Sequence, residues 1–201
     1  MKFFRPGIEE RITLPFPPAR DEDEISRLKD IIRNRTAKDV KSIRDHDEIP
    51  FYALKKYCEE NGLIFHGDEF SDLINQSVPI ILHFKKMFNR RRPAEVDNKL
   101  NTLPSKTNKT PSYPSGHSTQ ARLVARYVAG KFPEHEIELL KRGDECGMGR
   151  VQAGFHYPTD DEAGILLGEK LYVFLNKDDY ENWAILRKSK SQKSTLKIKI
   201  Y

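Results

Sequence analysis

The sequence predicts an all-α fold, organised as a compact helical bundle of one domain. Apolar side chains recur at helical spacing in most segments after residue 20. The 201 residues correspond to one domain, at roughly 100–200 residues per domain. The mean hydropathy of −0.69 is polar, but the 11 Phe and 8 Tyr argue against a disordered chain because they can fill a core.

Composition and charge divide the chain into three regions. Residues 1–20 contain four prolines and predict an extended N-terminal segment. Residues 21–186 are the expected helical domain. Residues 187–201 carry six basic side chains and no acidic one, so the net charge of +5 belongs to this tail and the remainder is close to neutral. We expect a solvated basic tail, with binding to an anionic partner as the alternative.

Four helices are expected in the first half of the chain. The first begins at Asp21 as its cap, the second after Thr36, and the third at Pro50. The fourth is a longer apolar helix over residues 69–89, with Pro79 as a candidate kink. The side chains expected to face the core from the first three are Ile25, Leu28, Ile31, Ile32, Val40, Ile43, Phe51, Leu54 and Tyr57.

A long loop separates these helices from the rest. Residues 93–114 contain four prolines among Asn, Ser, Thr and Lys, and loops of this length are usually functional or disordered. Helices are then expected over residues 115–131, from Pro133 with Ile137 on its apolar face, and from Pro158.

Weaker patterns mark the C-terminus. A short helix is expected around Trp183. Residues 195–201 alternate apolar and polar side chains, which is typical of a strand. Residues 11–14 are the only similar run, so a small terminal β-ribbon is the one departure from an all-helical chain that the sequence suggests.

No segment predicts a membrane span or a secretory leader. The longest apolar runs fall far short of the roughly 20 residues of a spanning helix. The N-terminal residues lack the apolar stretch of a signal peptide. Cys58 and Cys146 are too few for a disulfide framework and are expected to be reduced. We therefore expect a soluble, cytoplasmic protein.

Three clusters of residues carry the chemistry. One cluster comprises Ser115, Gly116 and His117. Ser115 and Gly116 immediately precede a helix, whose N-terminal amides and dipole attract anions, and His117 lies in the first turn of that helix. An ordinary Ser cap is the structural alternative. Another cluster, earlier in the chain, comprises Lys85 and Arg92, which belong to a basic run. The structural alternative is that this run is only a solvated helix end.

The third cluster joins Arg150, His156 and Asp160. A carboxylate four residues after a histidine can accept a hydrogen bond from one imidazole nitrogen and leave the other free as a nucleophile. The alternative is that Asp160 only caps the helix that begins near Pro158. Taken together, the three clusters gather three cations, anion-binding amides and two histidines, a combination that chance rarely produces.

The clusters match, in order, the signature of a superfamily that joins type 2 phosphatidic acid phosphatases, class A bacterial acid phosphatases and vanadium haloperoxidases. Residues 112–118 most resemble the class A stretch Ser-Tyr-Pro-Ser-Gly-His-Thr. The sequence departs from the pattern at Gly149, where Ser is usual, and at Tyr157, where acid phosphatases often have Trp. Class A enzymes are normally exported, whereas this chain shows no signal.

The resemblance implies a phosphomonoesterase with a phosphohistidine intermediate, which makes residues 21–186 a phosphatase domain. It implies that His156 is the nucleophile, Asp160 orients it, and His117 is the general acid and then the general base. The implied phosphate ligands are Lys85, Arg92, Ser115, Gly116 and Arg150. It also implies that no metal or other cofactor is needed, that vanadate inhibits as a phosphate mimic, and that the pH profile is bell-shaped in the acid-to-neutral range.

Several alternatives stay open. The expected substrate is a small phosphate ester such as a nucleotide or sugar phosphate, since lipid phosphatases of the superfamily usually span membranes. A vanadate-dependent haloperoxidase, or a protein that binds nucleic acid or an anionic surface and keeps a vestigial phosphate site, are the rivals. Nucleic acid is not the expected partner, and a homo-oligomer is left open. Of the other histidines, His46, His66 and His135 are expected on the surface, and His83 is expected to be packed.

Overall fold

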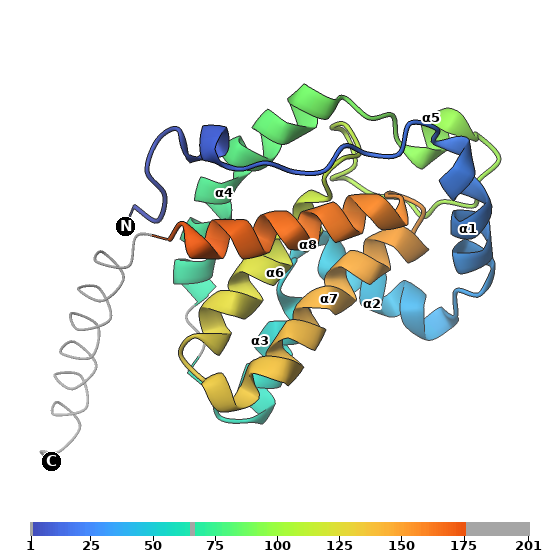
Figure 1. Ribbon diagram of the computed structural model, residues 1–201. Coiled ribbons are helices and arrows are strands. Elements are labelled where there is room, and N and C mark those ends of the chain that lie inside the picture. Colours follow the sequence, from blue (N-terminus) through green and yellow to red (C-terminus); the bar gives the residue numbers. More distant parts are fainter. Residues whose placement is uncertain (1, 65–66, 176–201) are drawn as a thin grey trace, which may run out of the picture.

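The computed structural model describes residues 2–64 and 67–175 (Figure 1). This part of the chain is helical, with no strand in it. Its helices are α1 (Glu22–Arg33), α2 (Ala37–Glu48), α3 (Tyr52–Glu60), α4 (Gly67–Phe88), α5 (Pro93–Val96), α6 (Gly116–Ala129), α7 (Glu136–Gln152) and α8 (Pro158–Val173). Two 3₁₀ turns, η1 (Ile8–Arg11) and η2 (Pro133–His135), complete the set. The all-α prediction is confirmed.

Helix α6 lies at the centre of the bundle and contacts α4, α7 and α8 (Figure 1). Ten of its residues are buried, because apolar side chains such as Leu123 and Val124 occur on most of its faces. Helix α8 approaches it closely at two glycines. A Cβ on Gly164 would lie 2.6 Å from the Ser115 carbonyl oxygen, and one on Gly168 would lie 2.7 Å from that of Thr119. This close approach holds the N-termini of α6 and α8 side by side.

The N-terminal segment packs onto the bundle instead of projecting into solvent (Figure 1). Phe3, Phe4, Ile8 and Leu14 are at most 6% exposed and belong to the main apolar core. The Tyr113 hydroxyl donates a 2.5 Å hydrogen bond to the Pro15 carbonyl. The segment is thus part of the core. Its proline content predicted only an extended conformation and not this burial.

Several helix starts differ from the prediction. Thr36 does cap α2, in a reciprocal capping box with Asp39. The Asp21 side chain makes no cap bond to α1, and it pairs with Arg90 at 2.9 Å instead. Pro50 precedes the first helical residue of α3 by two positions. Helix α4 continues as one element through Pro79.

Some predicted environments are wrong. Ile137 is 87% exposed, so the apolar face of α7 is defined by other residues. His46 is buried and not on the surface, since its ring nitrogens bond to the Ser42 carbonyl and the Ala53 amide and tie α2 to α3. His83 is exposed. His66, the helix expected around Trp183, the basic tail and the 195–201 half of the β-ribbon lie outside the described residues, and residues 11–14 contain no strand.

Candidate active site

A pocket of about 190 Å³ lies where α4, α6 and α7 meet the long loop. Six of the eight predicted site residues line it, and Ser115 and Asp160 are fully buried behind it. The long loop contributes to the wall, so its conformation shapes the site. The lining residues are Val78, Ile81, Leu82, Lys85, Arg92, Thr107, Thr110, Gly116, His117, Gln120, Arg150 and His156.

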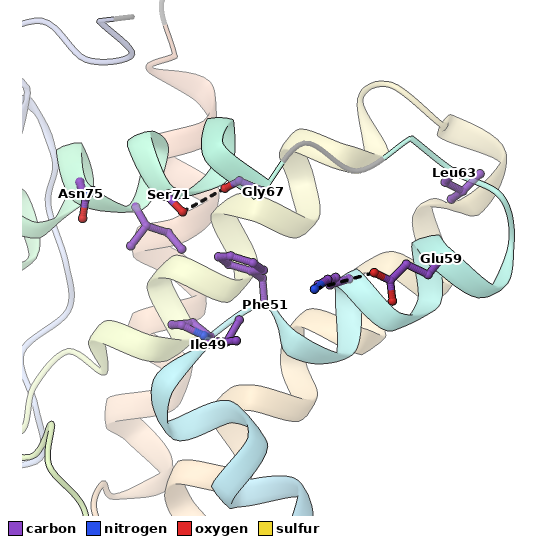
Figure 2. A pocket seen from close by; sticks show the side chains of 10 residues that line it. Ile49, Phe51, Glu59, Leu63, Gly67, Ser71 and Asn75 are labelled. Carbon is purple, nitrogen blue, oxygen red and sulfur yellow. Dashed lines mark hydrogen bonds and ion pairs between the residues drawn. The ribbon is translucent and has the colours of Figure 1, made fainter.

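A larger groove of about 600 Å³ lies elsewhere, between α3 and the start of α4 (Figure 2). Its walls include apolar side chains such as Ile49, Phe51 and Leu63. Its two charged side chains, Lys55 and Glu59, pair with each other at 3.8 Å. Because no histidine or arginine lines this groove, the smaller pocket is the one with the chemistry.

His156 is held by Asp160 at the start of α8. Its Nδ1 lies 3.2 Å from Asp160 Oδ2, and its Nε2 lies 3.4 Å from Arg92 Nη1 at the pocket. A carboxylate only accepts and a guanidinium only donates, so we assign the proton to Nδ1 and the lone pair to Nε2. Burial and the charge of Arg92 also lower the pKa of His156 well below its ordinary value, so the ring is neutral.

Asp160 makes both of the contacts that the sequence left open. Its Oδ2 accepts from the Tyr157 backbone amide at 2.9 Å, which caps α8, and also faces His156. The same oxygen accepts a short hydrogen bond from the Ser112 hydroxyl. Burial raises the pKa of Asp160, and the charge of Arg90, which donates to Oδ1 at 2.8 Å, opposes that shift.

Lys85 and Arg92 are oriented by main-chain carbonyls. Lys85 Nζ donates to the carbonyls of Pro111 and Ser112 at 2.5 and 3.2 Å. Arg92 donates to those of Thr110 and Phe155 at 2.7 and 2.8 Å. Carbonyls hold a cation in place without neutralising it. Burial and the neighbouring guanidiniums therefore lower the pKa of Lys85 to about 7 and that of Arg92 to about 10.

Arg150 and His117 line the same pocket as Lys85 and Arg92. The Arg150 guanidinium stacks 4.4 Å from the Phe155 ring centre and pairs with Asp47. His117 is in the first turn of α6, with Nε2 3.2 Å from the Asp47 carbonyl oxygen. Burial and the charge of Arg150 lower the pKa of His117 to about 3. The pKa values of Lys85, Arg92 and His117 are thus all lowered by burial and by neighbouring positive charge, a pattern that is frequent at functional sites.

Ser115 and Gly116 form the N-terminus of α6. The Ser115 hydroxyl accepts from the Ser118 amide at 3.4 Å and from the Ser118 hydroxyl at 2.7 Å, so it caps the helix as the structural alternative proposed. The Ser115 amide donates to the Asp160 carbonyl at 2.8 Å. Gly116 lines the pocket. Contact between phosphate and the Ser115 hydroxyl stays a prediction.

Two important residues escaped the sequence reasoning. Arg90 belongs to the basic run that suggested a solvated helix end, yet only 5% of it is exposed and it pairs with Asp21, Glu24 and Asp160. Asp47 had no motif around it. The partners of both residues are distant in sequence, so no local pattern could have identified them.

Comparison with known families decides the relationship. The family pattern of the PAP2 superfamily matches residues 71–183, more than half of the chain. The chain belongs to the PAP2 superfamily. The matched region contains all eight predicted site residues, from Lys85 in α4 to Asp160 in α8.

Two kinds of curated proteins are similar to this chain. A non-specific acid phosphatase of Salmonella typhimurium is 38% identical over 87 residues, 42% of this chain and 35% of the relative. An acid phosphatase of Zymomonas mobilis is 33% identical over 97 residues, 47% of this chain and 37% of the relative. A lipid A 1-phosphatase of Rhizobium etli is 39% identical over 57 residues, 28% of this chain and 25% of the relative. The matches thus span about a third or less of these relatives.

The fold is shared with a solved structure. The LpxE structure of Aquifex aeolicus superimposes with a TM-score of 0.59 at 21% identity, covering 79% of this chain and 97% of that one. In the part of our chain that is described, no helix combines the length and apolar character needed to cross a membrane.

Proposed function

We propose that this chain hydrolyses phosphate monoesters through a phosphohistidine formed at His156. The observation that carries the proposal is the orientation of His156. Its Nδ1 is held by Asp160, and its unprotonated Nε2 opens into a pocket with three cations. A neutral imidazole positioned beside an anion site is suited to attack phosphorus. The acid phosphatases among the relatives support this reaction class.

In the first step, Nε2 of His156 attacks phosphorus while the bond to the leaving oxygen breaks. Lys85, Arg92 and Arg150, with the Gly116 amide, hold the three non-bridging oxygens. Asp160 stabilises the positive charge that develops on the His156 ring. The proposal includes no metal ion, because these cations supply the charge stabilisation that dominates phosphoryl transfer.

His117 supplies the proton to the leaving oxygen. In the empty pocket the pKa of His117 is about 3, and a bound phosphate dianion raises that pKa because it favours the charged ring. In the second step, water attacks the phosphohistidine and gives its proton to His117, and phosphate leaves with His156 restored. This double role is worth about 10²–10⁴ in rate.

The substrate class is a finer proposal. We favour a small soluble ester, such as a nucleotide or sugar phosphate, because the pocket is small and most of the residues that line it are polar or charged. The lipid A 1-phosphatase among the relatives, together with Val78, Ile81 and Leu82 on the α4 wall, makes a lipid phosphate the second candidate. Hydrolysis of a nucleoside monophosphate, compared with that of a lipid phosphate in detergent micelles, separates the two.

The test is hydrolysis of p-nitrophenyl phosphate from about pH 4 to about pH 9, with and without a chelator. We expect wild-type turnover that survives the chelator and is lost in His156→Ala. Quenching with alkaline detergent after brief reaction with ³²P-labelled substrate should leave on the wild type a label that acid then removes, and none on His156→Ala. Undiminished turnover by that variant would refute the assignment, and an inactive wild type on the whole substrate panel would refute the function.

The role of His117 has a separate test. The p-nitrophenolate group leaves without a proton, whereas an alkoxide needs one. His117→Ala should therefore lose far more activity with an alkyl phosphate than with p-nitrophenyl phosphate. Equal losses with both esters would show that His117 is not the acid. The cytoplasmic location, the domain limits and the oligomeric state stay predictions.

A further inference from the structure

The last turn of α2 reaches into the candidate site. The Asp47 carboxylate pairs with Arg150 Nη1. The same carboxylate accepts from the hydroxyls of Ser105 and Thr107 at 2.9 and 3.0 Å, which join it to the long loop. The main-chain carbonyl of Asp47 lies 3.2 Å from His117 Nε2. One residue thus occupies two of the groups that the proposed reaction needs.

Asp47 and Thr107 each take one terminal nitrogen of the Arg150 guanidinium. Its Nη1 pairs with Asp47, and its Nη2 donates to Thr107 Oγ1 at 2.9 Å. Its Nε is buried with no hydrogen-bond partner in the described part of the chain. The whole side chain is 2% exposed. Lys85 and Arg92 differ, because their side chains donate to main-chain carbonyls and Arg92 also faces His156.

His117 is held in a similar way. A carbonyl oxygen only accepts, so His117 Nε2 carries its proton and directs it at the Asp47 main chain. A leaving oxygen that receives the Nε2 proton takes the place of that carbonyl. None of the residues that line the described pocket is acidic, and Asp47 is the carboxylate that pairs with Arg150, one of the cations in that lining.

We propose that Asp47 is an internal competitor of the substrate's phosphate group, and that it thereby sets the affinity of the site. A phosphate dianion displaces the carboxylate from Arg150, and the end of α2 then releases His117. This inference rests on the proposed function, because it requires that the pocket binds phosphate. The opposite role for Asp47 is that of a positioning residue, which would hold Arg150 ready for phosphate.

The two roles predict opposite changes in the dissociation constant of orthophosphate, measured by calorimetry at constant ionic strength. Asp47→Ala removes the competing charge and should bind orthophosphate about tenfold more tightly than the wild type, which corresponds to about 1.4 kcal/mol. Asp47→Asn should be intermediate, because its amide oxygen still accepts from Arg150. A positioning role gives weaker binding in Asp47→Ala and near-normal binding in Asp47→Asn.

Asp45→Asn is the matched control. Asp45 lies two positions earlier on α2 and does not line the pocket, so this variant measures the effect of losing one nearby negative charge. It should change the dissociation constant by less than about twofold, as expected for a screened surface charge. An equal gain in Asp45→Asn and Asp47→Ala would overturn the proposal, as would unchanged or weaker binding in Asp47→Ala.

Arg92→Ala separates the inference from the proposed function. Loss of orthophosphate binding in Arg92→Ala, with tighter binding in Asp47→Ala, supports both. Binding by the wild type that Arg92→Ala does not weaken refutes the phosphate site and the inference with it. If Asp47→Ala fails to fold in a thermal unfolding scan, Asp47→Asn decides, because its amide can replace the carboxylate bonds to Ser105 and Thr107.

Discussion

Removal of the Arg90 charge should destabilise the protein far more than removal of the charge of the adjacent Arg91. Arg90 is buried, with bonds of 2.9, 2.5 and 2.8 Å to Asp21, Glu24 and Asp160, and it stacks 3.9 Å from the Tyr157 ring centre. Arg90→Met keeps the length of the side chain but leaves these carboxylates without their cation. Breaking a buried pair by removing one partner costs about 3–5 kcal/mol.

The matched control is Arg91→Met. The Arg91 side chain is 60% exposed, and its pair with Asp21 is 3.8 Å long, so its loss should cost less than about 1 kcal/mol. For a chain of this size, each kcal/mol lowers Tm by about 2–4 °C. We therefore expect Tm to fall by roughly 6–20 °C in Arg90→Met and by at most about 4 °C in Arg91→Met. Thermal unfolding followed by circular dichroism measures both.

The stability of Arg90→Met should also depend on pH in a defined direction. Without Arg90, burial raises the pKa of Asp160 further above its ordinary 3.8. The folded state then holds a proton that the unfolded state releases, so the loss of stability grows as the pH rises above that ordinary value. Equal Tm losses in Arg90→Met and Arg91→Met, or a smaller loss for Arg90→Met at neutral pH than at acid pH, would refute the reasoning.

Two further predictions concern the pocket and the helix contact behind it. Because the pKa of Lys85 is about 7, orthophosphate affinity should fall above that pH as the ammonium loses its charge. Lys85→Arg should move this loss of affinity to higher pH. The ratio of the dissociation constants of the variant and the wild type at each pH cancels the effect of the ionisation of orthophosphate itself. Gly164→Ala should cost about 1–3 kcal/mol in urea unfolding, because its Cβ would meet the Ser115 carbonyl oxygen at 2.6 Å. Gly67→Ala, where a Cβ meets nothing within 4 Å, is the control and should be nearly neutral.

The sequence predicted well what depends on neighbouring residues. Helical periodicity identified Ile25, Leu28 and Ile32 as the buried face of α1, and all three are at most 7% exposed. It failed at Ile137, where an apolar residue at the start of a helix lies beyond the surface that the neighbouring helices cover. Periodicity describes one helix, whereas burial depends on which other helices lie against it.

The site residues were predicted from three short motifs, and the structure brings them together at one pocket. Their catalytic roles remain to be tested. The motifs could not reveal Arg90 or Asp47, since Arg90 bonds to Glu24 66 positions away and Asp47 bonds to Arg150 103 positions away. Only the packing of α1 and α2 against the motif-bearing helices creates these contacts.

The basic run from Lys85 to Arg92 shows how neighbouring cations acquire different tasks. Arg90 points to the first turn of α1 and to Asp160, and carboxylates neutralise it within the protein. Lys85 and Arg92 point to the pocket, where main-chain carbonyls orient them and leave their charge uncompensated. The positive charge of Arg90 therefore stabilises the fold, whereas the charges of Lys85 and Arg92 destabilise it until an anion binds. Burial lowers the pKa values of Lys85 and Arg92. A bound phosphate should therefore raise the free energy of unfolding by more than the same ion pairs would at an exposed surface.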